Sequence, residues 1–257
     1  MSKDWAIGCV EFAVPGATLE EKLEKLESRR MWLELTNDGG RKPEDISGTF
    51  SSFKTPIKSV QANLLHELKT LSDSETEHKA AVRHVEETMR LASTVGAGHV
   101  VTTLAYGKPA AKDPRELAIK TYKKFSVLAE ELGVTVSIEP LGKNRSIFLP
   151  GTSEVYGLIR EVDSAHVRLM ADTMHIHDNG DDVHDVIAEY IDEISELQLR
   201  DTDSKPPGQG SIDFERVIKM VGKKFNGLLC LEYKPGPDPN EDFIQACDFA
   251  NVISAAR

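Results

Sequence analysis

The strongest constraint on the fold is the regular alternation of two kinds of segment along the chain. Short apolar runs rich in β-branched residues alternate with longer segments in which apolar residues recur every three or four positions. The first pattern is typical of buried β-strands and the second of amphipathic helices. We expect eight strands, at residues 5–10, 31–35, 57–64, 99–104, 134–138, 167–171, 194–199 and 228–231.

Several of the expected helices have recognisable ends. Asp113 stands before Pro114, and Glu116 follows three residues after Asp113, an order that favours a capped helix start. Gly96 and Gly133 come at the ends of periodic segments, where glycine commonly ends a helix because it adopts positive φ. Helices are therefore predicted between the expected strands.

The alternation predicts one barrel. Eight units in 257 residues leave about 32 residues each, the size of one strand–helix module. Strands separated by helices pair in parallel, so we predict an α/β fold, a single (β/α)8 TIM barrel, with residues 1–257 as one domain. The main rival is a doubly wound sheet. It is disfavoured because no G-x-G-x-x-G motif follows the first strand.

Residues 37–55 interrupt the pattern. This segment contains Gly39, Gly40, Pro43 and Gly48 and shows no clear helical periodicity. We expect a long loop in place of the second helix, either a lid over a substrate site or a solvated connector.

Composition narrows the class of protein. With 31 Lys and Arg against 42 Asp and Glu, the net charge is -11, which disfavours nucleic acid as a partner because phosphate binding needs clustered basic residues. No stretch approaches the roughly 20 apolar residues of a membrane helix, and the start of the chain lacks the apolar run of a signal peptide. Its three cysteines, Cys9, Cys230 and Cys247, form no paired motif. We therefore expect a cytoplasmic enzyme acting on a small molecule, with its oligomeric state left open.

Polar residues end four of the expected strands. Glu139, Asp172, Gln198 and Glu232 follow apolar runs and are separated by 33, 26 and 34 residues, close to the length of one module. In a TIM barrel the carboxyl ends of the strands form the functional face, so these side chains are expected at one level of that face. A single acid in such a place is more often a helix cap or a solvated loop residue, but four in register are harder to explain that way.

Three carboxylates in one pocket point to a bound cation. Without one, Glu139, Asp172 and Glu232 would repel each other and raise one another's pKa. Two glutamates, one aspartate and the amide oxygen of Gln198 form an oxygen-rich ligand set, which suits one divalent Mn, Mg or Co ion better than a thiolate-seeking metal. Zn also remains compatible.

The same residues resemble a known family. Glu139-Pro140, Asp172-x-x-His175, Gln198-Leu-Arg-Asp201 and the loop Pro207-Gly208-Gln-Gly210-Ser-Ile-Asp213, followed by Leu231-Glu232, are similar to the xylose-isomerase-like sugar phosphate isomerase/epimerase superfamily. The resemblance covers most of residues 130–235 and fades toward the N-terminus. It implies that Glu139 and Glu232 are both metal ligands and the catalytic acid/base pair, that Asp172 binds the metal, and that His175 contacts substrate or transfers a proton. His175 could equally be a structural histidine at the barrel mouth.

One residue departs from the family pattern. The chain has Gln198 where the family usually has histidine. Relatives that dehydrate cyclic keto-polyols, such as dehydroshikimate and keto-inositol dehydratases, resemble this chain in using glutamine there. An amide oxygen still coordinates a hard cation, so glutamine is compatible with the metal site. The departure leaves open whether the reaction is an isomerisation or a dehydration.

Three more strand-end residues are candidates for substrate binding. Arg200, Glu34 and Glu11 end or follow strands and could bind substrate hydroxyls or a phosphate, although Glu34 could instead cap the following turn. The DNA-repair endonuclease branch of the superfamily needs additional metal-binding histidines. This chain has Gln61, Asn63, Thr102, Thr103 and Asp213-Phe214-Glu215 at those places, which argues against a nuclease.

The sequence thus predicts a metal-dependent enzyme acting on a polyhydroxy carbonyl compound. Removal of a proton next to the carbonyl gives an enediolate, which the cation would stabilise. Return of the proton gives isomerisation or epimerisation, the preferred prediction, whereas loss of a β-hydroxyl gives dehydration. The third alternative is a non-catalytic barrel that only binds a sugar or a partner protein.

Overall fold

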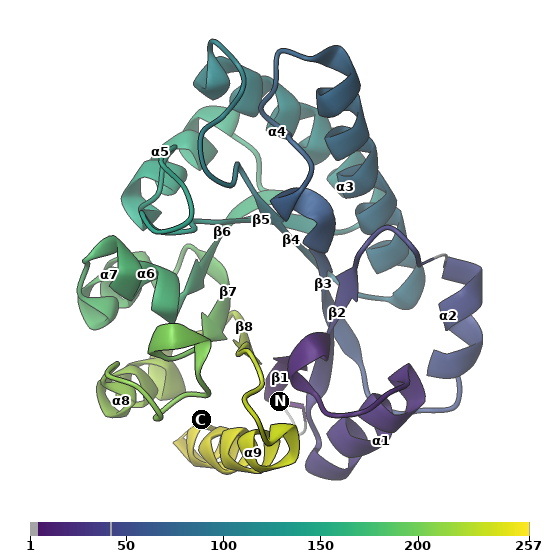
Figure 1. Ribbon diagram of the computed structural model, residues 1–257, viewed down its shortest axis with the longest axis vertical. Helices are drawn as coiled ribbons and strands as arrows, with labels where there is room; N and C mark the ends of the chain where they lie inside the picture. Colours follow the sequence, from purple (N-terminus) through teal and green to yellow (C-terminus); the bar gives the residue numbers. More distant parts are fainter. Residues whose placement is uncertain (1–4, 42, 257) are drawn as a thin grey trace.

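A computed structural model describes residues 5–41 and 43–256 of the chain. Eight parallel strands close into a barrel, with each strand hydrogen-bonded to its neighbours in sequence and β8 paired with β1 (Figure 1). The strands are β1 (Ile7–Val10), β2 (Trp32–Asn37), β3 (Ile57–Ala62), β4 (His99–Thr103), β5 (Thr135–Glu139), β6 (Val167–Asp172), β7 (Ile194–Leu199) and β8 (Leu228–Leu231). The predicted (β/α)8 barrel is confirmed, and every expected strand has its counterpart.

Helices surround this barrel in the outer layer of Figure 1. They are α1 (Leu19–Arg29), α2 (Pro43–Phe50), α3 (Glu75–Val95), α4 (Pro114–Leu132), α5 (Thr152–Val162), α6 (Thr173–Asn179), α7 (Val183–Tyr190), α8 (Phe214–Lys224) and α9 (Pro239–Ala256), with short 3-10 helices η1 (Glu11–Ala13), η2 (Asn63–His66) and η3 (Thr202–Ser204). The expected ends are confirmed: Asp113 accepts a hydrogen bond from the Glu116 backbone N–H, and Gly96 and Gly133 end their helices with φ of 76° and 68°.

The second helix was wrongly expected to be absent. Helix α2 lies inside the 37–55 segment, which we expected to be a loop. It has eight residues, about two turns, so Ile46 and Phe50 are too few apolar positions to reveal a helical period. Ile46 is buried and anchors the helix, so tertiary packing stabilises a segment whose own pattern is weak.

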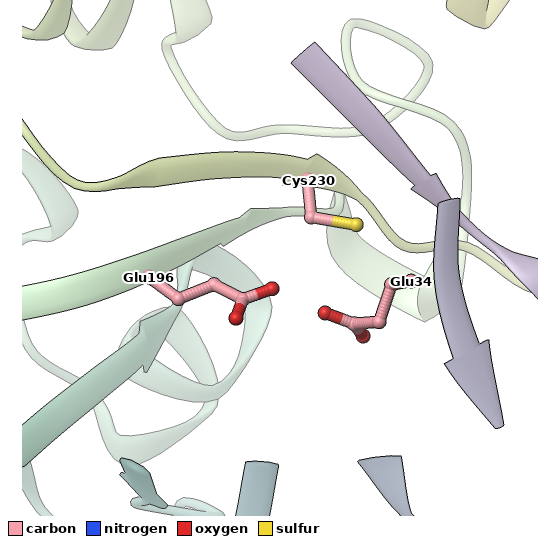
Figure 2. A group of neighbouring side chains, drawn as sticks. All are labelled: Glu34, Glu196 and Cys230. Atoms are coloured by element: carbon pink, nitrogen blue, oxygen red, sulfur yellow. The ribbon is translucent and has the colours of Figure 1, made fainter. Parts of the chain in front are cut away.

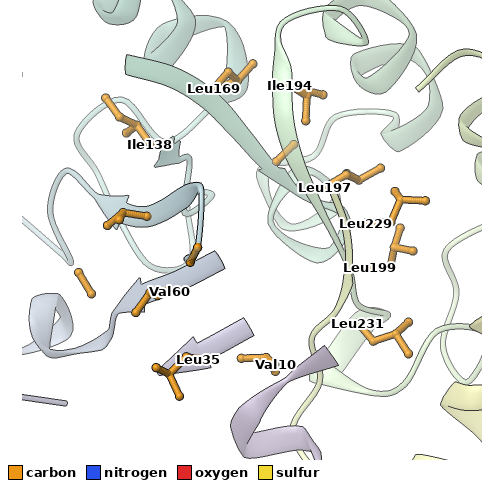
Figure 3. Close-up of a cluster of buried hydrophobic side chains, with 14 of the residues drawn as sticks. Val10, Leu35, Val60, Ile138, Leu169, Ile194, Leu197, Leu199, Leu229 and Leu231 are labelled. Atoms are coloured by element: carbon orange, nitrogen blue, oxygen red, sulfur yellow. The ribbon is translucent and has the colours of Figure 1, made fainter. Parts of the chain in front are cut away.

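Side chains alternate between two environments along each strand. On β7, Leu197 and Leu199 belong to the large apolar core, whereas Glu196 and Gln198 lie on the opposite face, inside the barrel. Figure 3 shows part of that core, with labelled side chains from β1, β2, β3, β5, β6, β7 and β8. The apolar core therefore lies between strands and helices, and the barrel interior is free to hold polar groups.

Among the helices of the described residues, none combines the length and apolar character that a membrane span requires.

Candidate active site

The four strand-end residues are brought to one end of the barrel. Glu139 ends β5, Asp172 ends β6, Gln198 lies near the end of β7, and Glu232 directly follows β8. The strand register pairs Asp172 with Gln198, which places those two at one level. All four are at least nine-tenths buried. A small hollow of about 30 Å³ lies beside Glu139, lined in part by Gln61, Thr103 and Tyr106.

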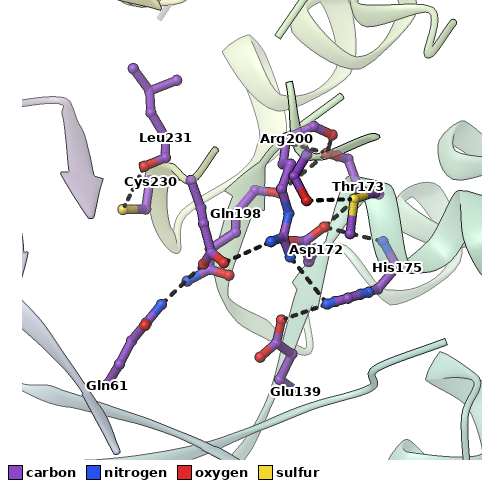
Figure 4. Close-up of polar contacts among 12 residues, drawn as sticks. Gln61, Glu139, Asp172, Thr173, His175, Gln198, Arg200, Cys230 and Leu231 are labelled. Atoms are coloured by element: carbon purple, nitrogen blue, oxygen red, sulfur yellow. Dashed lines mark hydrogen bonds and ion pairs between the residues drawn. The ribbon is translucent and has the colours of Figure 1, made fainter. Parts of the chain in front are cut away.

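Arg200 lies at the centre of this group (Figure 4). One guanidinium nitrogen, Nη2, is 2.5 Å from Asp172 Oδ2 and 3.1 Å from His175 Nε2, and Nη1 is 2.9 Å from Glu232 Oε1. Arg200 was expected to contact substrate, but its side chain is only 5% exposed and is engaged by these two carboxylates. It thus supplies one positive charge among the predicted metal ligands.

The Asp-x-x-His spacing has a local structural cause. Asp172 is the N-cap of α6, and its Oδ1 accepts hydrogen bonds from the backbone N–H groups of Met174 (2.7 Å) and His175 (3.1 Å). The first turn of the helix thereby returns the His175 ring to the site, with Nε2 3.5 Å from Glu139 Oε1. Burial lowers the pKa of His175 to about 3, so the imidazole is neutral at physiological pH.

The carboxylates carry more negative charge than their surroundings neutralise. Burial, followed by the charges of Glu232 and Asp172, raises the pKa of Glu139 well above its usual value. Burial also raises the pKa of Glu232, to about 7, although the Arg200 guanidinium opposes the shift. Negative charge is therefore costly in this pocket, as expected for a site that binds a cation.

A second layer of polar groups lies beneath the first. Glu34 Oε1 accepts hydrogen bonds from Gln61 Nε2 (2.5 Å) and Gln198 Nε2 (2.7 Å), and Gln61 Nε2 also lies 3.0 Å from Glu232 Oε2. Glu34, a predicted substrate-binding residue, has a completely buried side chain whose carboxylate contacts the two glutamines. Gln61, which the sequence offered only as an argument against a nuclease, connects the two layers.

Glu34 also belongs to a second buried group, together with Glu196 and Cys230 (Figure 2). One potential ligand atom from each lies within 4.8 Å of the others. Burial is the main cause that raises the pKa of both Glu34 and Glu196. Glu196 did not figure in the sequence analysis. Its position two residues before Gln198 could have revealed it, since alternate residues of a strand share a face.

Glu11, another of the substrate candidates, has structural partners. Its Oε2 accepts hydrogen bonds from the backbone N–H (3.2 Å) and hydroxyl (2.9 Å) of Thr36, and its Oε1 pairs with Arg41. These contacts join the end of β1 to the end of β2 and to the segment that leads to α2.

The residues at the mouth fit a divalent metal. Glu139, Asp172 and His175 each offer a ligand atom within 4.8 Å of the others, and all three are buried. Gln198 Oε1 is buried and has no hydrogen-bond partner among the described residues, as expected of an acceptor kept for a ligand. Glu232 is joined to this group through Arg200. His175, whose predicted role was with substrate or proton, is thus also within reach of a metal.

Comparison with known proteins gives relatives named as an epimerase of D-psicose and an isomerase of inosose. The chain is 27% identical over 103 residues to a D-psicose 3-epimerase of Enterocloster bolteae, covering 40% of this chain and 34% of that protein. It is 24% identical over 171 residues to an inosose isomerase of Bacillus licheniformis, covering 60% of each. The matches thus span less than two thirds of the length of these curated relatives.

Solved structures and a family model agree on the fold. The IOLI protein with a zinc atom superposes with a TM-score of 0.79 at 16% identity, covering 98% of this chain and 99% of that one. The model of the xylose isomerase-like TIM barrel family matches residues 49–251. This match covers most of the chain and includes all four strand-end residues, Arg200 and His175. The chain belongs to the xylose isomerase-like TIM barrel family.

Proposed function

We propose that this protein is a divalent-metal-dependent isomerase or epimerase of a sugar or sugar phosphate. The observation that carries the proposal is the convergence of the buried carboxylates of Glu139, Asp172 and Glu232 at the carboxyl ends of the strands. The epimerase and isomerase among the relatives support the reaction class, and the zinc atom in a structural neighbour supports a metal.

Glu139, Asp172, Gln198 and Glu232 would hold the cation, with His175 as a further potential ligand. When bound, the cation supplies Lewis-acid stabilisation to negative charge that develops on the substrate's oxygens. Glu139 and Glu232 come from strands three positions apart in the barrel, so they reach the substrate from different sides. One removes the proton next to the carbonyl and the other returns a proton, to the opposite face of the same carbon in an epimerase or to the neighbouring carbon in an isomerase.

The remaining residues hold this pair in place. Arg200 and Gln61 both contact Glu232, which orients the carboxylate and stabilises its charged form. Burial raises the pKa of Glu232, which makes this carboxylate a stronger base than an exposed glutamate. The neutral His175 lies beside Glu139 and serves as a hydrogen-bonding partner for a substrate hydroxyl.

A dehydratase of a cyclic keto-polyol is the second candidate. The observation in its favour is Gln198, which replaces the usual histidine of the family. Dehydration also requires an acid to protonate the leaving hydroxyl, and His175 is the nearest candidate. Burial lowers the pKa of His175, which disfavours it as that acid, and the epimerase and isomerase among the relatives favour the first candidate.

Metal analysis and isotope exchange test the proposal together. The purified protein is expected to bind one divalent cation per chain, to lose thermal stability on chelation, and to exchange a carbon-bound proton for deuterium with a ketose or ketose phosphate in heavy water. Full activity after complete chelation would refute metal dependence. An ultraviolet enone signal with dehydroshikimate or keto-inositol, without exchange in any ketose, would establish the dehydratase instead. Absence of both bound metal and turnover would favour a non-catalytic barrel that only binds a sugar or a partner protein.

A further inference from the structure

The buried carboxylate of Glu34 determines which way two glutamine side chains face. A glutamine amide has a donor end, Nε2, and an acceptor end, Oε1. Glu34 Oε1 accepts from the Nε2 groups of both Gln61 (2.5 Å) and Gln198 (2.7 Å). With its donor end held there, the Gln198 amide must direct its oxygen elsewhere.

That oxygen is the atom the proposed metal site needs. Gln198 Oε1 is buried and lacks a hydrogen-bond partner within the described part of the chain. A flipped amide would present N–H groups to the cation, and an amide N–H cannot act as a ligand. The Gln61 amide held by the same carboxylate also donates to Glu232 Oε2 at 3.0 Å, so Glu34 additionally fixes a partner of a second proposed ligand.

We propose that Glu34 is a positioning residue of the metal site, which orients the Gln198 amide oxygen toward the cation and Gln61 toward Glu232. This inference rests on the proposed function. The side chain of Glu34 is fully buried, and its contacts with the proposed ligand set run through the two glutamines. Such supporting contacts change metal affinity by about 10–100-fold when removed.

Substitutions of Glu34 can distinguish the effect of its acceptor position from the effect of its charge. Its Oε1 accepts from both glutamines, and its carboxylate also faces that of Glu196 (Figure 2), with one oxygen of each within 4.8 Å of the other. In E34Q the amide oxygen can accept from Gln61 and Gln198 while its NH₂ group points toward the Glu196 carboxylate. In E34D the charge is kept, but the acceptor is withdrawn by one methylene. Glu34→Met removes the acceptor altogether.

The experiment measures Mn²⁺ affinity of the full chain by isothermal titration calorimetry after chelation and dialysis. E34M and E34D are expected to bind Mn²⁺ about 10–100-fold more weakly than wild type, and E34Q within a few-fold of it. If only the charge of Glu34 mattered, the order would be reversed, with E34D close to wild type and E34Q impaired. That reversed order, or unchanged affinity in a folded E34M or E34D, would overturn the inference.

A second set of variants, made in the Q198E protein, tests whether Glu34 acts through Gln198. A carboxylate has acceptors at both ends and cannot be flipped into a wrong orientation, so Glu34→Met should matter much less in the Q198E background. An equal loss in both backgrounds would show that Glu34 does not act through Gln198. Circular dichroism melting establishes that each variant is folded, and E34D, which keeps a polar group, replaces E34M if the latter does not fold. Failure of wild type to bind Mn²⁺ would instead count against the proposed function.

Discussion

At the scale of single residues, the two proposed acid/base glutamates lie in different surroundings. Glu232 is held by Arg200 at 2.9 Å and by Gln61 at 3.0 Å. Glu139 has the neutral His175 imidazole 3.5 Å from its Oε1, and burial together with the charges of Glu232 and Asp172 raises its pKa. Both carboxyls therefore have raised pKa values, and Glu232 is the one held by a guanidinium and an amide.

Replacing either glutamate by its amide should remove proton transfer without removing volume. We expect E139Q and E232Q each to lower kcat by at least about 100-fold, the usual contribution of general acid–base catalysis. The measurement is turnover of whichever ketose shows deuterium exchange, with E131Q, a change at an exposed residue of α4, as the control. Retention of more than about a tenth of wild-type kcat, a loss under about 1.4 kcal/mol, would remove that glutamate from the proposed mechanism.

At the scale of elements, the segment after β5 is packed directly onto α6. Gly142 has a φ of +70°, and a Cβ at this position would lie 2.7 Å from the backbone oxygen of His175. The close approach of two backbones therefore contributes to the position of His175, in addition to the Asp172 cap. Gly180, at the end of α6, also has positive φ, but its Cβ would meet nothing within 4 Å.

Alanine substitutions at Gly180 and Gly142 distinguish the cost of a strained backbone conformation from the cost of a steric clash. G180A should lower the free energy of unfolding by about 1 kcal/mol, the cost of a left-handed non-glycine residue. G142A should cost about 1–3 kcal/mol more because neighbouring backbone must shift. It should also reduce kcat, since the displaced atoms carry His175. Urea unfolding and turnover provide the measurements. Equal stability of the two variants would show that the contact between the segment and α6 is not constraining.

At the scale of the whole molecule, the barrel has its proposed site at one end and a perturbed histidine at the other. His99 begins β4, and burial, assisted by the charge of Arg168, lowers its pKa to about 4. The folded protein thus binds a proton at His99 less readily than the unfolded chain, whose histidine pKa is about 6.5. This group supports stability above pH 6.5, and that support is lost as the pH falls from 6.5 toward 4.

The resulting loss is measurable at mild acidity. Between pH 7.5 and pH 5.0, His99 should account for about 2 kcal/mol of the decrease in unfolding free energy, at about 1.4 kcal/mol per pH unit. H99Q should therefore show a smaller decrease over this range in urea titrations, whereas H66Q, at an exposed position, should follow wild type. An identical pH dependence in H99Q and wild type would show that His99 is not the source.

The local pattern of the sequence was enough to predict the barrel and the level of its site. Strand periodicity, helix caps and the place where an apolar run ends depend on neighbouring residues, so all eight strands and the alignment of Glu139, Asp172, Gln198 and Glu232 could be read from it. Helix α2 could not, because two turns with one strongly buried residue show no period.

Closure of the barrel decided the rest. Arg200 turns toward Asp172 and Glu232, and Glu34 meets Gln61 and Gln198, because strands far apart in sequence become neighbours or face each other across the interior. The local sequence pattern shows only that each of these residues is polar and ends or interrupts an apolar run. Which partner a buried polar group finds depends on where the other walls of the barrel place theirs, and only the tertiary structure fixes that.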